Sequence, residues 1–285
     1  IALDLPGMGV SNRVYGDYSK FQFEDAENFF VQKLNFALNK IGVEKFHFVS
    51  HSFGAYISCL YTMKNPTRVL SLCLLSPVGI TSCYMEWVST QFEDFYQKAM
   101  YYLKKAPTDG YKMLPFADKV IDKLLSHKLQ YIKNEEEIGV FKDMANIMFN
   151  LPSTSEYLIY HFFNASIQAY KPINYYFECF KNHKIDFIYG DRDWNPVDHA
   201  EEFKKVLPDT VDIHVILDSG HVLYCDNFSD LTNKILEIFD RNKFIELNKE
   251  ELQHLKENYK KHYEEIVQEH PEIKKSVFLE VPEQI

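Results

Sequence analysis

The segment from Phe46 to Tyr56, F-H-F-V-S-H-S-F-G-A-Y, constrains the fold of this chain more than any other. It begins with an apolar run whose aromatic and β-branched bias is typical of a parallel strand covered on both faces. After Ala55 the apolar spacing becomes helical and continues to Asn65-Pro66, where the proline ends the helix. A second apolar run, Val69 to Leu75, follows. We therefore predict a strand-helix-strand unit with parallel strands, in a fold of the α/β class.

Ser52 lies at the predicted turn between this strand and this helix, in the local sequence S-H-S-F-G. The G-x-S-x-G motif holds a serine nucleophile on a strained turn at the carboxyl edge of a parallel sheet. Ser50 stands where that motif has its first glycine, but Ser50 and Gly54 are both small, as a close approach of strand and helix requires. The alternative interpretation is that Ser52 is an ordinary helix N-cap.

Two later apolar runs each lead into a loop that carries a polar residue suited to catalysis. The run from Ile185 to Tyr189 precedes G-D-R-D-W-N-P, and the run from Val211 to Leu217 precedes D-S-G-H. We expect both runs to be strands, and their loops to supply Asp193 as the acid and His221 as the base of a catalytic triad.

Each residue of this predicted triad has a defined chemical task. His221 would accept the proton of the Ser52 hydroxyl during attack. Asp193 would bind the other ring nitrogen, fix the tautomer and stabilise the imidazolium. The backbone N–H of Phe53, at the positive end of the helix, would donate a hydrogen bond to the oxyanion.

Simpler interpretations of these loop residues remain open. Asp191 is a second candidate for the acid. Both Asp191 and Asp193 are also suited to a turn before a helix with Asn195 as its cap and Pro196 at its first position. His221 is one of 11 histidines and could have no role.

Residues 1 to 240 resemble an α/β-hydrolase, a family whose triad also occurs in the order serine, acid, histidine. The sequence D-L-P-G-M-G-V-S from Asp4 to Ser11 resembles the family's strand and loop that precede the nucleophile. A narrower resemblance, to the abhydrolase subfamily of phospholipid metabolism, is carried by S-N-R at 11–13, H-S-F-G-A-Y at 51–56, S-P-V-G at 76–79 and G-H-V-L-Y-C-D at 220–226. That subfamily includes N-acyl-phospholipid lipases, lysophosphatidic acid acyltransferases and a lipase co-activator.

The resemblance implies a mostly parallel sheet flanked by helices, with a helical cap. It also implies a serine hydrolase that acts on carboxylic esters or amides of phospholipids or lysophospholipids through an acyl-enzyme, with acylation of lysophosphatidic acid as a second outcome. His221 and Asp226 resemble the H-x-x-x-x-D acyltransferase motif. Alternatively, Asp226 lies at the N-terminus of the helix running to about Asp240 and caps it.

Two other functions are compatible with the resemblance. The first is a small-ester hydrolase or peptidase, because a fold does not determine the substrate. The second is a noncatalytic lipase co-activator or regulator in lipid homeostasis. The co-activator branch lacks a serine at the nucleophile position, so Ser52 argues against this second function.

We expect four segments along the chain. Residues 1–79 and 185–240 form the two parts of the hydrolase core, and residues 80–184, where helical spacing replaces the strand pattern, form the cap. Most aromatic residues of the cap are expected to pack in the core, and a minority to line an acyl-chain channel. Residues 241–285 are a charged, amphipathic C-terminal extension whose apolar stripe comprises Leu252, Leu255, Tyr259, Tyr263 and Ile266.

The chain opens within the predicted strand 1–5, at Ile1. We therefore expect a fragment that lacks the N-terminal strands, and with them the loop that supplies the second oxyanion donor. A targeting segment would not be visible in such a fragment.

Composition excludes several classes of function. The net charge of −10 argues against nonspecific binding of nucleic acid, and no glycine-rich loop indicates a cofactor. The chain has 5 cysteines without C-x-x-C spacing, which favours a reducing compartment and no metal. No apolar run reaches the ~18 residues of a membrane span. We expect an intracellular protein, cytoplasmic or peripheral on a membrane or lipid-droplet surface.

Overall fold

The computed structural model of this chain describes residues 1–9, 11–81, 132, 135–150, 154–163, 168–195, 197–241 and 257. Its elements, with η for a 3-10 helix, are η1 (Tyr18–Lys20), α1 (Phe23–Lys40), β1 (Phe46–His51), α2 (Phe53–Lys64), β2 (Val69–Leu75), α5 (Glu135–Asn150), η2 (Ser155–His161), η3 (Ile173–Cys179), β3 (Lys184–Gly190), α6 (Asp198–Val206), β4 (Val211–Ile216), α7 (Leu223–Asp226) and α8 (Phe228–Arg241).

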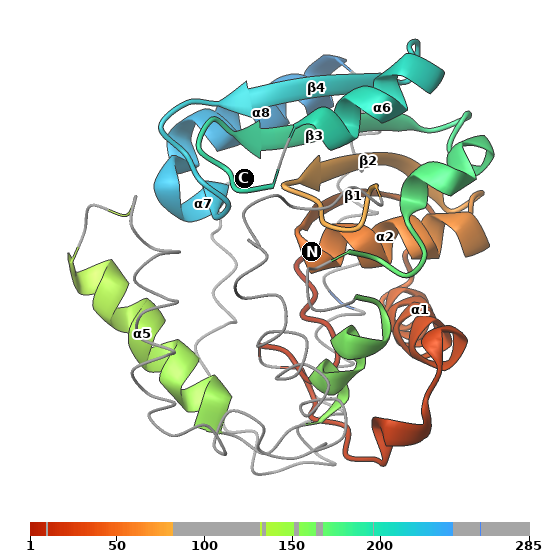
Figure 1. Ribbon diagram of the computed structural model, residues 1–285, viewed down its shortest axis with the longest axis vertical. Coiled ribbons are helices and arrows are strands. Elements are labelled where there is room, and N and C mark those ends of the chain that lie inside the picture. The colour runs from red at the N-terminus through yellow and green to blue at the C-terminus, as the bar shows by residue number, and fades with distance from the viewer. Residues whose placement is uncertain are drawn as a thin grey trace, which may run out of the picture.

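The described strands form one parallel sheet in the order β1-β2-β3-β4 (Figure 1). The predicted strand-helix-strand unit is confirmed as β1, α2 and β2, and both later apolar runs are strands, β3 and β4. Leu75 pairs with His51 on one side and with Ile188 on the other. The carboxyl ends of the strands therefore lie close together along one edge, where the predicted site loops begin.

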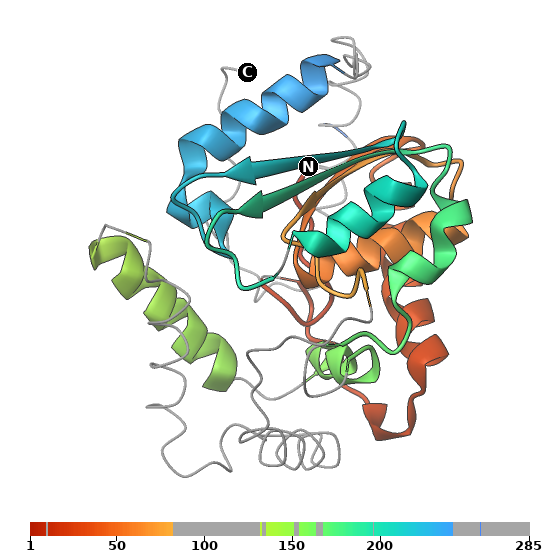
Figure 2. The ribbon, with the colours of Figure 1, turned by 45° about the horizontal axis from the view of Figure 1, so that its top comes forward.

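The two faces of the sheet are covered by different helices, because side chains alternate along a strand. Leu72 and Leu74 of β2 belong to a core cluster that includes residues of α2 and α6, whereas Cys73 and Leu75 pack in a second cluster with Leu231 and other residues of α8. In Figures 1 and 2, α8 accordingly lies on one side of the sheet, and α2 and α6 lie on the other. The predicted parallel sheet flanked by helices is confirmed.

Two details of the predicted core are wrong. Residues 1–5 do not form a strand, because a strand requires ladder hydrogen bonds and none of the described strands pairs with them. The first strand is also not covered on both faces by the described residues, since β1 is mostly half-buried and Val49 is 43% exposed. β1 is the edge of the described sheet, and α8 contacts the strands further from it.

Parts of the predicted cap lie outside the described residues, as do Cys83 and the apolar stripe of the C-terminal extension. Within the described part, Phe162 and Phe163 are buried and contact the Tyr56 ring. These two cap aromatics therefore pack in the core, as expected for most of them. None of the helices among the described residues is both long and apolar enough to cross a bilayer.

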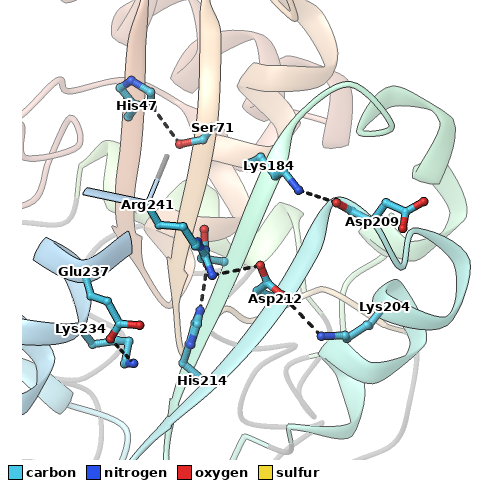
Figure 3. A network of polar contacts seen from close by, with 11 residues as sticks. His47, Ser71, Lys184, Lys204, Asp209, Asp212, His214, Lys234, Glu237 and Arg241 are labelled. Atoms are coloured by element: carbon cyan, nitrogen blue, oxygen red, sulfur yellow. Dashed lines mark hydrogen bonds and ion pairs between the residues drawn. The ribbon is translucent and has the colours of Figure 1, made fainter. Parts of the chain in front are cut away.

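A buried carboxylate ties α8 to the sheet. Asp186 of β3 accepts a hydrogen bond from His214 Nε2 of β4 at 2.8 Å and pairs with Arg241 at the end of α8. Arg241 also reaches Asp212, which in turn pairs with Lys204 of α6 (Figure 3). Burial alone raises the pKa of Asp186, but the hydrogen bonds from His214 and Arg241, with the charge of Arg241, bring that pKa below its ordinary 3.8.

We expect Asp186→Ala to lower the free energy of unfolding at pH 7 by about 2 kcal/mol, because it removes the acceptor of His214, whose side chain is only 14% exposed. Asp212→Ala is the matched control on the next strand. Its side chain is 40% exposed, so less than about 1 kcal/mol should be lost.

The effect of Asp186 should also depend on pH. A carboxyl group whose pKa is lower in the folded than in the unfolded state stabilises the folded state at pH values above its unfolded-state pKa. That stabilisation is lost as the pH falls through the folded-state pKa. The difference between wild type and Asp186→Ala in urea denaturation should therefore shrink below pH 3.8; equal losses in the two variants would contradict this role.

Candidate active site

Ser52 lies on a strained turn between β1 and α2. Its φ and ψ are 52° and −117°, a combination that is unfavourable for any residue with a side chain. Its backbone N–H donates to Leu75 O at 2.9 Å, which anchors the turn to the end of β2. Ser52 occupies the N-cap position of α2, but its hydroxyl makes no capping hydrogen bond. The ordinary N-cap interpretation is therefore wrong, and the hydroxyl is directed elsewhere.

Of the two small residues that flank this turn, Ser50 has a reason different from the expected one and Gly54 has none in the described structure. The Ser50 hydroxyl is 2.8 Å from that of Ser58, which is buried on α2, so a serine here joins strand to helix by a hydrogen bond. In the described part of the chain, a Cβ added to Gly54 would meet no atom within 4 Å. The crowding predicted at Gly54 is therefore not observed.

The loops after β3 and β4 are joined by their main chains. The N–H of Asp191 donates to Ile216 O, and that of Arg192 donates to Ser219 O, both at 2.9 Å. A Cβ added to Gly190 would lie 2.2 Å from Ser219 O, so only glycine allows this approach. The two loops are thus held side by side above the ends of β3 and β4.

The structure brings Ser52, His221 and Asp193 into one chain of hydrogen bonds. Ser52 Oγ lies 3.0 Å from His221 Nε2, and His221 Nδ1 lies 3.0 Å from Asp193 Oδ1. A carboxylate only accepts, so Nδ1 carries the proton and Nε2 is the acceptor for the Ser52 hydroxyl. The side chains of His221 and Asp193 are 8% and 1% exposed. Asp193 Oδ1 also accepts the N–H of Asn195 at 2.9 Å, which orients the carboxylate.

The other acidic residue of this loop, Asp191, has a different partner. Its Oδ1 accepts the N–H of Ser219 at 2.9 Å, so it braces the base loop and does not contact His221. Asn195 does not cap a helix, because α6 begins only at Asp198 after Val197. Instead, the buried Asn195 amide donates to Pro77 O at 2.7 Å. Pro196 lies outside the described residues.

The backbone N–H of Phe53 opens the first turn of α2. Among the described residues it has no hydrogen-bond acceptor, as expected of a group kept available for an oxyanion. The Phe53 side chain is 9% exposed and contacts the rings of Phe30 and Phe162. It packs in the core. No residue of this chain was assigned as the second oxyanion donor.

Asp226 does not cap the helix that follows it. That cap is Asn227, whose Oδ1 accepts the N–H of Asp230 at 3.3 Å. Asp226 instead accepts the N–H of Gly220 through Oδ2 at 2.9 Å. Burial raises the pKa of Asp226, and the hydrogen bond from Gly220 opposes the change.

Two further residues contact His221 and were not singled out from the sequence. The Trp194 ring lies against the imidazole, with centroids 4.5 Å apart and planes at 36°. His51 Nε2 donates to the main-chain oxygen of His221 at 2.7 Å. The only sequence signal is adjacency, since His51 precedes the predicted nucleophile and Trp194 follows the predicted acid.

This arrangement is suited to activating a hydroxyl for attack on an acyl carbon. The base lies within hydrogen-bond reach of the nucleophile, and a buried carboxylate orients the base. The N–H that follows the nucleophile has no acceptor among the described residues and lies at the positive end of a helix, where negative charge is stabilised.

Known proteins match this chain over most of its length. The α/β-hydrolase fold family matches residues 1–228. A probable 1-acylglycerol-3-phosphate O-acyltransferase of Oryza sativa subsp. japonica is 22% identical, over 80% of this chain and 57% of its own length. The abhydrolase domain-containing protein lid-1 of Caenorhabditis elegans is 25% identical, over 78% of this chain and 65% of its own length. The chain thus spans less than two thirds of these relatives.

Solved structures with the same fold include two hydrolases. A serine hydrolase from Cycloclasticus zankles superposes with a TM-score of 0.57 at 17% identity, covering 85% of this chain and 79% of its own. A bacterial membrane phospholipase A gives 0.56 at 18% identity, covering 85% and 69%. At such identities the likeness supports the fold alone.

Proposed function

This chain belongs to the α/β-hydrolase fold family, and we propose that it is a serine hydrolase of phospholipid or lysophospholipid esters or amides. Ser52, His221 and Asp193 are its triad, and acylation of lysophosphatidic acid is a second outcome of the same intermediate. The observation that carries the proposal is the pair of 3.0 Å hydrogen bonds joining a strained serine to a histidine and the histidine to a buried carboxylate.

Each half of the proposed reaction uses two proton transfers at His221. Ser52 Oγ attacks the acyl carbon while His221 Nε2 takes its proton, and the oxyanion accepts a hydrogen bond from Phe53 N–H. The imidazolium then protonates the leaving oxygen or nitrogen, and an acyl-enzyme remains. In the second half, His221 Nε2 takes a proton from the attacking water or lysophospholipid hydroxyl and returns it to Ser52 Oγ as the acyl–serine bond breaks. Water as the acceptor releases fatty acid, whereas a lysophospholipid hydroxyl becomes acylated.

The lipid substrate class is supported by the names of the relatives. The rice protein and an Arabidopsis thaliana relative, 24% identical over 80% of this chain, are named as 1-acylglycerol-3-phosphate O-acyltransferases. In the proposed mechanism transfer and hydrolysis share one acyl-enzyme on Ser52, so the two outcomes differ only in the acceptor.

A noncatalytic regulator is the alternative from another class. Such a protein needs no activated nucleophile, whereas Ser52 pays a backbone cost in a left-handed conformation and faces a histidine acceptor. Strain of this kind is typical of functional sites, so it favours a catalytic function over a purely regulatory one.

We expect the purified protein to release fatty acid from micellar lysophospholipid or N-acyl-phospholipid, with little activity on short-chain esters or peptides. Any acyl-CoA-dependent acylation of lysophosphatidic acid should depend on the same two residues. Both activities should fall by a factor on the order of 10⁴ or more in Ser52→Ala and in His221→Ala. Product formation is measured by mass spectrometry of the released and transferred acyl chains.

The pattern across these variants separates the outcomes. Acylation that persists in Ser52→Ala but is lost in His221→Ala and Asp226→Ala would replace the acyl-enzyme by a general-base acyl transfer. Faster turnover of short esters or peptides than of lipids would reassign the substrate. If none of these lipids, short-chain esters and peptides is turned over, the result would favour the noncatalytic regulator.

A further inference from the structure

Asp226 lies beside the proposed triad but does not belong to it. Both ring nitrogens of His221 are occupied, Nε2 by Ser52 and Nδ1 by Asp193. The Asp226 carboxylate is directed instead at the main chain before His221, where Oδ2 accepts the N–H of Gly220 at 2.9 Å. Its Oδ1 is buried and has no hydrogen-bond partner in the described part of the chain.

His51 holds the main chain on the other side of the base. Its Nε2 is 2.7 Å from His221 O, and since a carbonyl only accepts, Nε2 must carry the proton. The two imidazole rings also pack together, with centroids 4.9 Å apart. His51 is the last residue of β1 and immediately precedes Ser52. This contact therefore ties the base directly to the strand that carries the nucleophile.

We propose that Asp226 is a positioning residue that, together with His51, clamps the main chain around His221, and that its carboxylate acts as a hydrogen-bond acceptor and not in proton transfer to or from substrate. The inference rests on the proposed function, because it assigns a role to Asp226 through the base His221.

The loop has a mechanical need for such a clamp. Glycine has more conformational freedom than any other residue type, so the chain at Gly220 needs hydrogen bonds to fix it. Arg192 N–H holds the carbonyl of the Ser219–Gly220 peptide at 2.9 Å, and Asp226 holds the N–H of the same peptide. Asp226 is placed to supply that bond because α7 turns the chain back, with Asp226 N–H donating to Val222 O at 3.1 Å. A displacement of about 1 Å at a reacting group can cost on the order of 10² in rate.

A matched pair of substitutions separates an acceptor from a proton carrier. Asp226→Asn keeps an oxygen for Gly220 N–H and removes the ionisable group, whereas Asp226→Leu has similar size and no acceptor. The readout is the reaction of Ser52 with a fluorophosphonate probe, followed as a rate constant and as a final labelled fraction. Misplacement of His221 lowers the rate constant, whereas misfolding lowers the labelled fraction.

We expect Asp226→Leu to lower the rate constant by about 10- to 100-fold, and Asp226→Asn by no more than about threefold, with full labelling in both. Turnover of lipid should show the same ranking, with kcat lowered and KM unchanged. His51→Leu, which has no N–H donor in its side chain, should likewise lower the rate constant more than His51→Gln, which keeps one.

Three results would overturn the clamp. The first is a wild-type rate constant in Asp226→Leu, and the second is an Asp226→Asn variant as slow as Asp226→Leu, which would make the ionisable group essential. The third is a reduced labelled fraction at an unchanged rate constant, which would mean that Asp226 only supports folding.

Amide hydrogen exchange at Gly220 tests the clamp without chemistry at Ser52. The Gly220 N–H should be protected in the wild type and in Asp226→Asn, and should exchange at least about 10-fold faster in Asp226→Leu. If wild-type Ser52 does not react with the probe, the proposed function fails. Unchanged exchange in Asp226→Leu would refute the clamp independently of that result.

Discussion

Ser52→Ala is expected to abolish both covalent labelling by a fluorophosphonate probe and turnover of lipid substrates, with kcat reduced by a factor on the order of 10⁴ or more. Labelling requires attack of Oγ on phosphorus with loss of fluoride, and an unactivated serine does not react in this way. The 3.0 Å contact with His221 Nε2 is what should activate this hydroxyl. Intact-mass spectrometry and peptide mapping measure the labelling and identify the residue.

Ser229→Ala is the matched control, because Ser229 is exposed on α8 and is not a hydrogen-bond partner of Ser52, His221 or Asp193 among the described residues. It should label and turn over as the wild type does. Labelling at full stoichiometry in Ser52→Ala would place the reactive serine elsewhere and refute the proposed triad.

Asp193→Asn should also give a large effect, a fall in kcat of about 10⁴-fold with little loss of stability. The amide can present its oxygen to the N–H of Asn195 or of His221, but it cannot stabilise the imidazolium that forms during attack. It also allows the wrong histidine tautomer, because the NH₂ group of the asparagine can donate to an unprotonated Nδ1. Steady-state kinetics with thermal denaturation of the same samples separates this effect from unfolding.

Asp191→Asn is the control for charge in the same loop. Its amide oxygen can still accept the N–H of Ser219, so activity should fall by less than about fivefold. If Asp191→Asn were the more damaging variant, the acid would have to be reassigned to Asp191.

Strand positions could be predicted from the sequence because they depend on local properties. The runs Val69–Leu75 and Ile185–Tyr189 are mostly apolar and end in turn residues, and both are strands that lie in the interior of the described sheet. The prediction failed at residues 1–5, where an apolar run has no described partner. Apolar character indicates that a segment can pair, but only a neighbour at hydrogen-bonding distance makes it a strand.

The partners of polar side chains depended on distances that the sequence does not contain. Asp191 and Asp193 are two residues apart and chemically identical, yet only Asp193 reaches His221, because Asp191 is turned toward the main chain at Ser219. Asp226 was predicted to be either part of a motif with His221 or a helix cap. It binds Gly220 N–H, and Asn227 forms the cap.

The sequence by itself determined the fold class, the order of the strands along the chain and the three loops that carry Ser52, Asp193 and His221, because hydrophobic period, turn residues and chain order are local or linear properties. The tertiary structure alone decided which carboxylate meets the base, why a serine suits position 50, and that His51 and Trp194 lie against His221. These depend on how parallel strands align their carboxyl ends and on how each loop turns above them. Such contacts join residues far apart in the sequence, and no local pattern specifies them.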